Sequence, residues 1–227
     1  TVITLLYFIE NIGLILQRYG AVFARGLCNT LWLSFVSVFL GTFLGILVAL
    51  GKLSRHKLLN GVVSTYIEII RGTPILLQLY FFWLALPNIL PSISDTTCIL
   101  SALVVNASAY IAEVIRAGIQ AVDAGQREAS LSLGMTERAI MTKVIFPQAI
   151  KNILPALGNE VIVMIKQTSL ASVFFFGELM TAYKQVQSTT FLALEPLTIS
   201  GLIYLFLTVT LSRITRHFEK RMKQNER

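Results

Sequence analysis

Five apolar runs, each close to the length of a membrane-spanning helix, constrain this chain more than any other feature. A helix needs roughly 20 apolar residues to cross the hydrocarbon core of a bilayer. The runs cover about residues 24–51, 60–86, 97–121, 148–167 and 196–213. Apolar residues make up 55% of the sequence and charged residues only 14%, whereas about a quarter of a soluble domain is charged. The sequence therefore predicts an all-α, polytopic transmembrane helical bundle in which residues 1–227 form a single domain.

The first segment of the chain is also apolar but carries polar residues in its middle. Glu10 and Asn11 interrupt the run over residues 1–17. A helix of this kind lies more favourably at the membrane surface than across the core. We therefore predict an N-terminal interfacial helix in addition to the five spans.

Basic residues are unevenly distributed over the connections between the runs. Most of them follow the first run, lie beside the connection between the third and fourth runs, or follow the fifth run: Lys52, Arg55, Lys57, Arg116, Arg127, Arg138, Lys143, Lys151, Arg213, Arg216, Lys220, Arg221, Lys223 and Arg227. Because such residues favour the cytoplasmic side, the N-terminus is predicted outside and the C-terminus in the cytoplasm. The net charge of +7 is thus explained by membrane flanks, and it indicates no nucleic-acid partner.

One polar stretch, EASLSLGMTERAIMTKVIFP, lies in the connection between the third and fourth runs, from Glu128 to Pro147. Gly134 in its middle lowers helix stability by about 1 kcal/mol relative to alanine, so we predict either a turn or a close backbone approach there. Pro147 is compatible with the first turn of the next helix, where its missing N–H does no harm. The stretch therefore predicts a short cytoplasmic helix that ends where the fourth span begins.

The apolar residues of this stretch suggest a docking surface. If residues 126–141 form one helix, Ala129, Leu133, Ala139 and Ile140 lie near one face of it. Such an edge has no obvious partner within the chain, so we predict a docking element for another protein. A helical connector that lies on the membrane surface is the alternative.

The spacing within this stretch is similar to a family pattern. The chain reads Glu128-Ala129-Ser130, then Gly134, then nine residues before Val144-Ile145-Phe146-Pro147. This resembles E-A-A-x-x-x-G followed after nine residues by I-x-L-P, the pattern of permease subunits of bacterial ABC importers for polar amino acids. Serine, valine and phenylalanine replace the pattern residues at 130, 144 and 146. The resemblance extends through IEIIRGTPILLQLYF, SAYIAEVIRAGIQAV and LPALGNEVIVMIKQTSL, and covers roughly residues 20–215.

The resemblance implies a set of partners. A coupling loop at about residues 123–147 would insert into a cleft on a separate ATP-binding cassette subunit, and the residues implied are Glu128, Ala129, Gly134, Met135 and Pro147. The sequence contains no G-x-x-x-x-G-K-[ST] phosphate loop, so ATP and Mg would bind to that ATPase subunit, with no cofactor and no enzymatic activity in this chain. A second permease copy, identical or related, an extracytoplasmic substrate-binding protein and a location in the bacterial cytoplasmic (inner) membrane are also implied.

Polar groups at membrane depth are candidates for substrate contact, because they are energetically expensive there. The candidates are Glu160, Asn159, Asn106, Ser108, Gln167 and Phe175. Glu160 lies about 20 Å from the cytoplasmic start of the fourth run, and Asn106 and Ser108 lie about 14–17 Å deep in the third. A charged Glu160 favours the ammonium or guanidinium group of arginine, lysine or histidine. The alternative is a structural glutamate, protonated or paired with a residue such as Lys166.

Two further pairs of charged residues are expected to serve structure or gating. Glu68 and Arg71 are spaced i,i+3 and can pair on one helix face, and Glu113 and Arg116 repeat this spacing. Pro74, after a glycine and a threonine, must interrupt the second run because it lacks an N–H.

The resemblance implies ATP-driven import of polar, in particular basic, amino acids by alternating access, and this is the function that we predict. A secondary transporter without an ATPase is one alternative, but matching broken helices in two inverted halves are not evident. A scaffold that only anchors a peripheral partner is another, although it has no need for Glu160 in the membrane interior. His56 and His217 lie far apart in basic flanks and indicate no metal site.

Overall fold

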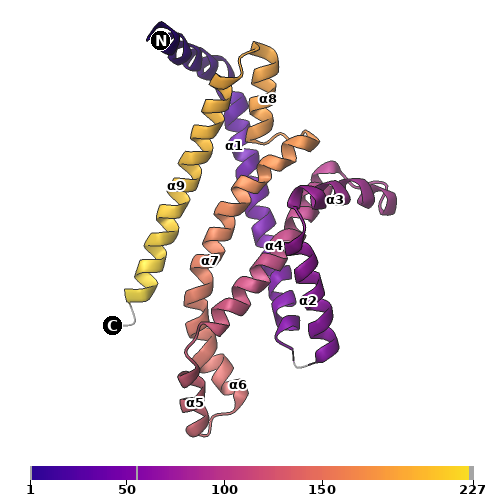
Figure 1. The fold of residues 1–227 in the computed structure, drawn as a ribbon, viewed down its shortest axis with the longest axis vertical. Helices are drawn as coiled ribbons and strands as arrows, with labels where there is room; N and C mark the ends of the chain where they lie inside the picture. The colour runs from indigo at the N-terminus through magenta and orange to yellow at the C-terminus, as the bar shows by residue number, and fades with distance from the viewer. Residues whose placement is uncertain (1, 55, 225–227) are drawn as a thin grey trace.

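The computed structural model describes residues 2–54 and 56–224, and this part of the chain consists of helices and short connections (Figure 1). The elements are α1 (Val2–Lys52), α2 (Lys57–Gly72), α3 (Ile75–Ile89), α4 (Asp95–Gln120), α5 (Ala124–Ser132), α6 (Glu137–Ile140), the π-helical η1 (Met141–Ile145), α7 (Phe146–Gln167), the 3-10 helix η2 (Thr168–Phe174), α8 (Leu179–Thr190) and α9 (Leu194–Gln224). Over these ranges the chain forms no strand. The predicted all-α architecture is confirmed.

The long helices account for the five predicted spans. Three are long and apolar enough to cross a membrane alone, over Thr4–Lys52, Asp95–Gln120 and Leu194–Met222. Two bent pairs qualify when each is taken together: α2 with α3, bent by 107°, and the helix Glu137–Phe174 with α8, bent by 46°. By length and composition the structure thus provides up to five spans, in the places that the apolar runs indicate.

The N-terminal segment is not a separate helix. The stretch that we predicted as interfacial is continuous with the first span, since α1 runs unbroken over 51 residues. At 1.5 Å per residue α1 is about 76 Å long, far more than the roughly 30 Å of the hydrocarbon core. Its first turns tilt away from the rest of α1 in Figure 1. Glu10 and Asn11 interrupt the apolar run but not the helical hydrogen bonding of the backbone. The Asn11 side chain instead finds a partner outside α1, since it donates to Glu195 Oε1 of α9 at 3.2 Å.

The core lies where α4 packs against α1, α3 and α7. Leu33, Leu103 and Met164, from α1, α4 and α7, are buried in one apolar cluster. Gly41 of α1 permits a very close approach to α4, because a Cβ at this position would lie 2.6 Å from the Cβ of Ala107. These contacts set the relative positions of the helices that carry the candidate site residues.

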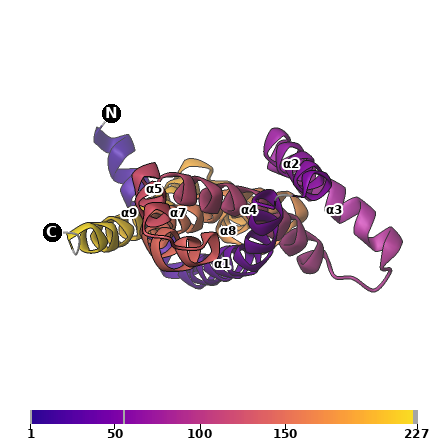
Figure 2. The ribbon, with the colours of Figure 1, turned by 90° about the horizontal axis from the view of Figure 1, so that it is seen from below.

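The helices at the two sides of the molecule are less embedded. Figure 2 shows α2 and α3 extending to one side of the central group, with α9 at the opposite side. A second apolar cluster, which includes Phe23, Leu179 and Ile199, joins α1, α8 and α9. The charged and polar groups described below lie on this central group and on the two more exposed arms beside it.

Candidate functional site

The loop of residues 123–147 contains two short helices separated by a glycine turn. Gly134 has φ +73°, a backbone conformation that glycine adopts without strain. The N–H of Gly134 donates to the Leu131 carbonyl at 2.9 Å, and that of Met135 donates to the Ser130 carbonyl at 3.1 Å. The predicted turn is confirmed, and the single helix over residues 126–141 is corrected to α5 and α6 because the left-handed glycine ends α5.

Side chains brace the two helices of this loop. Asp123 caps α5 by accepting from the Gly125 N–H at 2.8 Å. Arg127 of α5 pairs with Glu137 of α6 at 2.7 Å, although both side chains are about half exposed. The Arg127 guanidinium donates to the Glu137 carboxylate, and this hydrogen bond raises the pKa of the guanidinium. The pair links α5 and α6 across the turn at Gly134.

The apolar residues of the loop divide between two directions. Leu133 is 81% exposed, whereas Ile140 is 1% exposed and packs inside the chain. Glu128 and Ala129 are also exposed, and Ser130 is buried. The predicted common face is therefore wrong for Ile140, because the turn at Gly134 points the second helix back toward the molecule. An exposed surface that includes Ala129 and Leu133 remains.

The end of the loop is continuous with the fourth span. A helix runs from Glu137 through Phe174, with the π-helical segment η1 immediately before Pro147. Pro147 occupies the first turn of α7, as predicted. The N–H of Phe146 donates five residues back, to the Met141 carbonyl, which places the wider turn next to the residue that lacks an N–H.

The corner between α2 and α3 is closed by side-chain amides. α2 ends at Gly72 and α3 begins after Pro74, so the predicted interruption is confirmed. The Gln78 amide donates to the carbonyls of Ile70 at 2.7 Å and Thr73 at 3.2 Å, and to the Thr73 hydroxyl at 2.9 Å. Asn106 of α4, 3% exposed, donates to Gln78 Oε1 at 3.0 Å. The amides thus satisfy the carbonyls that the break releases.

Ser108 is engaged by the same arm of the molecule. Its hydroxyl lies 2.6 Å from the Tyr66 hydroxyl of α2, and Tyr66 also donates to the Val105 carbonyl at 3.2 Å. The two predicted substrate contacts on α4, Asn106 and Ser108, therefore both hydrogen-bond toward the α2–α3 arm.

Glu160 stands on α7 without a direct partner in the described part of the chain. No hydrogen bond or ion pair involves its partly buried carboxylate, and the charge that acts on it is that of Arg71. The alternative of a pair with Lys166 is not realised. Asn159 next to it is exposed, and Gln167 one and a half to two turns further along is half-buried.

The aromatic residues beyond α7 behave differently from one another. Phe174 is buried, with its ring centroid 4.9 Å from that of Tyr80, and Phe176 stacks on Trp32 at 6.4 Å. Phe175 is 87% exposed, has φ +56° and lies more than 20 Å along the chain from Glu160. The structure does not bring Phe175 and Glu160 together within one subunit.

A cluster of charged residues joins the C-terminal parts of α2 and α4. Arg116 binds Glu113 with two hydrogen bonds, of 3.0 and 2.9 Å, as the spacing predicts. Arg71 pairs with the same carboxylate at 3.3 Å and stacks over the Tyr110 ring at 5.3 Å. The predicted Glu68–Arg71 pair is therefore corrected: Arg71 reaches across to α4, and Glu68 of its own helix is left at the surface.

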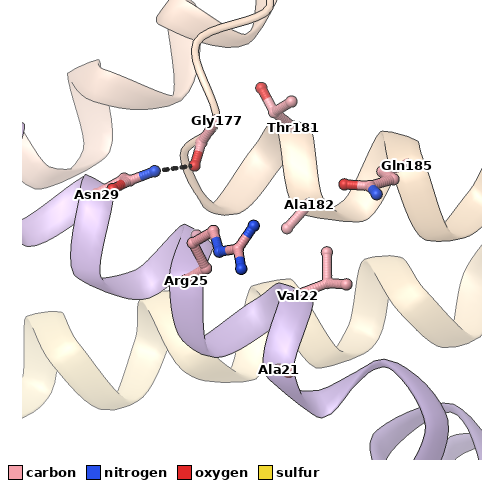
Figure 3. Close-up of a pocket in the computed structure, with 9 residues that line it drawn as sticks. Ala21, Val22, Arg25, Asn29, Gly177, Thr181, Ala182 and Gln185 are labelled. Atoms are coloured by element: carbon pink, nitrogen blue, oxygen red, sulfur yellow. Dashed lines mark hydrogen bonds between the residues drawn. The ribbon is translucent and has the colours of Figure 1, made fainter.

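A depression between α1 and α8 lies at the other end of the molecule. Figure 3 shows the Arg25 guanidinium extending from α1 toward α8, with Asn29 donating to the Gly177 carbonyl at 2.7 Å. Gln185 forms part of the wall, and the volume is about 280 Å³. None of the residues predicted from the sequence for a site lines it.

Glu178, at the start of α8, is a buried acid that the sequence reasoning missed. It is fully buried and accepts from the N–H groups of Met180 and Thr181 at 2.7 Å each. The Thr181 hydroxyl at 3.0 Å and the Tyr204 hydroxyl at 2.9 Å complete its shell. An acid that directly follows a glycine is a helix-capping signal from which a helix start at this position, and Glu178 as its cap, could have been predicted.

Comparison with known proteins places the chain in a family. Residues 41–224 match the family described as binding-protein-dependent transport system inner membrane component. The chain is 38% identical to the arginine transport system permease protein ArtQ of Bacillus subtilis, over 89% of this chain and 93% of ArtQ. It is 36% identical to the glutamine transport system permease protein GlnP of Escherichia coli K12, over 88% and 92% of the two chains.

A solved structure supports the same assignment. The chain shares 48% identity with an amino acid ABC transporter crystallised with histidines, and the TM-score is 0.89 over 92% of this chain and 97% of the other. The chain therefore belongs to the family of inner membrane components of binding-protein-dependent transport systems.

Proposed function

We propose that this chain is the permease subunit of an ABC importer that carries polar amino acids, with a preference for basic ones, by ATP-driven alternating access. The observation that carries the proposal is Glu160, a carboxylate within a membrane span without a direct partner among the described residues. A charged group in such a place marks a transport pathway more often than a structural contact. The arginine and histidine in the names of two similar proteins support a cationic substrate.

An ATPase partner is supported by the 123–147 loop. Its two helices are braced by Arg127 and Glu137, and it still exposes Ala129 and the large side chain of Leu133. A stable shape with an apolar tip suits insertion into a preformed cleft. ATP and Mg would bind to that separate subunit, and the continuous helix from Glu137 would transmit its movement.

A second copy of a permease and an external binding protein complete the proposed assembly. The α2–α3 corner encloses an apolar hollow of about 750 Å³, lined in part by Ile69, Leu77 and Phe81, which a membrane-embedded partner can fill. The family description names dependence on a binding protein. The distribution of basic residues supports an N-terminus outside and a C-terminus in the cytoplasm.

The proposed substrate role of Glu160 is tested by uptake of labelled amino acids into proteoliposomes. They hold the chain with its ATPase partner, and the binding protein is supplied outside. Glu160→Gln keeps the size of the side chain but removes its charge, so uptake of arginine and lysine should fall at least about tenfold. Glu10→Gln, at an exposed position of α1, is the matched control and should behave as wild type. Unchanged arginine uptake in Glu160→Gln would place the cation site elsewhere.

The proposed ATPase contact is tested by Gly134→Asp. Aspartate tolerates positive φ better than most residues, and nothing lies within 4 Å of the position where its Cβ would be, so the loop should keep its shape. The added charge should disrupt the contact with the cleft and abolish co-purification of the ATPase. Ser132→Asp, on the exposed surface of α5, is the charge-matched control. Normal assembly of Gly134→Asp would argue against docking at this turn.

A further inference from the structure

A polar cavity that the proposed function does not use lies where the C-terminal end of α1 meets α2 and the C-terminal part of α4. Its volume is about 480 Å³, and its wall includes Lys52, Ser64, Glu68, Arg71, Glu113 and Arg116. Most of these side chains carry charge, in contrast to the apolar hollow on the other side of the α2–α3 arm. Such a wall suits a small, charged ligand.

Positive charge exceeds negative charge around the centre of this cavity. The single carboxylate of Glu113 is shared by Arg116 at 2.9 Å and Arg71 at 3.3 Å, and the charge of Lys52 also acts on it. Lys52 itself donates to the Ser64 hydroxyl at 2.5 Å. Among residues 2–54 and 56–224, no carboxylate lies within ion-pair distance of the Lys52 ammonium. The one carboxylate of Glu113 thus balances the charge of three cations, and the positive charge that remains can bind a second carboxylate.

One free acid lies in the wall of the same cavity. Glu68 is exposed, and no hydrogen bond or ion pair involves it in the described ranges of the chain. The cavity therefore presents an ammonium and a carboxylate that both lack an ionic partner of their own. A ligand that carries one carboxylate and one ammonium group complements this arrangement.

We propose that this cavity is a second amino-acid site, on the release side of the permease, which binds the α-carboxylate through Lys52 and the α-ammonium through Glu68. The inference rests on the proposed function, because it assumes that amino acids pass through this chain. Arg71 connects the two sites, since it binds Glu113 in the cavity wall and its charge acts on Glu160. The cavity binds the α-carboxylate and α-ammonium groups that all α-amino acids share, and Glu160 binds the side chain.

A zwitterionic lipid headgroup carries a phosphate and an ammonium and is the rival occupant. The amino acid is favoured because the cavity shares Arg71 with the surroundings of Glu160, and because its wall is formed largely by charged and polar side chains. A lipid also needs an apolar path for its acyl chains. If an amino acid occupies the cavity, uptake should depend on the amino acid inside the vesicle. If a lipid headgroup occupies it, uptake should depend on the lipid composition of the bilayer.

The first test is inhibition of uptake from the inside. Proteoliposomes are loaded with arginine, with its methyl ester, which lacks the carboxylate, or with Nα-acetylarginine, which lacks the ammonium. Internal arginine should stabilise the inward-facing state and slow ATP-driven uptake, and the two derivatives should be at least about tenfold weaker. In Lys52→Gln and Glu68→Gln the inhibitory concentration should rise about tenfold, each measured against that variant's own uptake into empty vesicles. Lys57→Gln, an exposed lysine outside the cavity, should retain the wild-type value.

A second test needs no transport. Equilibrium binding of labelled arginine to the purified complex should show two sites per permease chain. Glu68→Gln should remove one site and Glu160→Gln the other. Loss of ATP-driven uptake in the wild type would count against the proposed function, whereas a single binding site that survives Glu68→Gln would overturn the second site alone.

Two results of the vesicle experiment would also overturn the proposal. One is equal inhibition of Glu68→Gln, Lys52→Gln and wild type by internal arginine. The other is wild-type uptake that depends on the fraction of phosphatidylethanolamine in the bilayer and not on internal arginine, with the dependence on the lipid lost in both variants. The latter result would assign the cavity to a lipid headgroup.

Discussion

Glu160 lies on α7 and Glu178 lies at the start of α8, and the surroundings of these two glutamates are opposite. Glu178 is fully buried and accepts four hydrogen bonds, two from backbone N–H groups and two from hydroxyls. Glu160 is only partly buried and has no direct partner among the described residues. Because a buried carboxylate is stable only when its oxygens are satisfied, Glu178 is suited to hold the fold together. Glu160 retains its binding capacity for something outside the chain.

The difference teaches that satisfaction of hydrogen bonds, and not depth or charge, separates the structural polar groups from the candidate functional ones. Asn106 and Ser108 lie in the membrane region like Glu160, but they are committed to Gln78 and Tyr66. Glu68, in contrast, has no hydrogen bond or ion pair in the described chain, and Lys52 in the same cavity wall donates to the Ser64 hydroxyl but has no ionic partner there. Three substitutions sharpen or break this distinction.

The largest effect on stability is expected for Glu178→Ala. Removal of the carboxylate leaves two helix N–H groups and two hydroxyls without their acceptor in a buried place, at a cost of at least about 3 kcal/mol. Glu160→Ala should change stability by less than about 1 kcal/mol, because no hydrogen bond is lost. Thermal unfolding of the two variants in the same detergent measures both. Equal destabilisation would mean that Glu160 is also a structural residue.

An intermediate effect is expected for Asn106→Leu. The substitution leaves Gln78 Oε1 unpaired in the core and should destabilise the protein by about 1–3 kcal/mol. The order of preference among transported amino acids should stay the same, because the amide is engaged by the α2–α3 corner. The comparison is made by competition between labelled arginine and unlabelled amino acids. A stable variant with a changed preference would restore Asn106 as a substrate contact.

The smallest effect is expected for Tyr204→Phe. It removes one of the four donors to Glu178, so the loss should be about 1 kcal/mol. Combined with Glu178→Ala, the additional loss should be close to zero, since the partner is already gone. Fully additive losses in the double variant would show that Tyr204 stabilises the fold through other contacts.

Periodicity and composition were sufficient for the helices but not for their continuity. The apolar runs predicted the five spans because the length of a span is set by the bilayer. The break at Pro74 and the turn at Gly134 were predictable because single residues determine them. The unbroken α1 was not, since Glu10 and Asn11 change the polarity of the run without changing its backbone hydrogen bonds. Their surroundings depend on α9, far away in the sequence.

The types of residue at the candidate site could be predicted from the sequence, but the ion pairs and hydrogen bonds that these residues form could not. Glu160 was identified because a charge at membrane depth is rare. The partner of Arg71 was not, because i,i+3 spacing favours Glu68, whereas the packing of α2 beside α4 brings Glu113 closer. The same reason explains Asn106: its amide fits a substrate as well as it fits a helix break, and only the fold decides between them.

The unbroken helix from the loop to the candidate substrate residue has a mechanical consequence. From Glu137 to Glu160 it is about 35 Å long, so a tilt of about 10° at the loop end displaces the backbone at Glu160 by about 6 Å. A force applied to the loop outside the membrane would thus move Glu160 by a tilt of the helix and not through a series of side-chain rearrangements. The π-helical segment η1 lies between the loop and α7, and Pro155 lies inside α7, so this helix departs from regular α-helical hydrogen bonding at two points along its length.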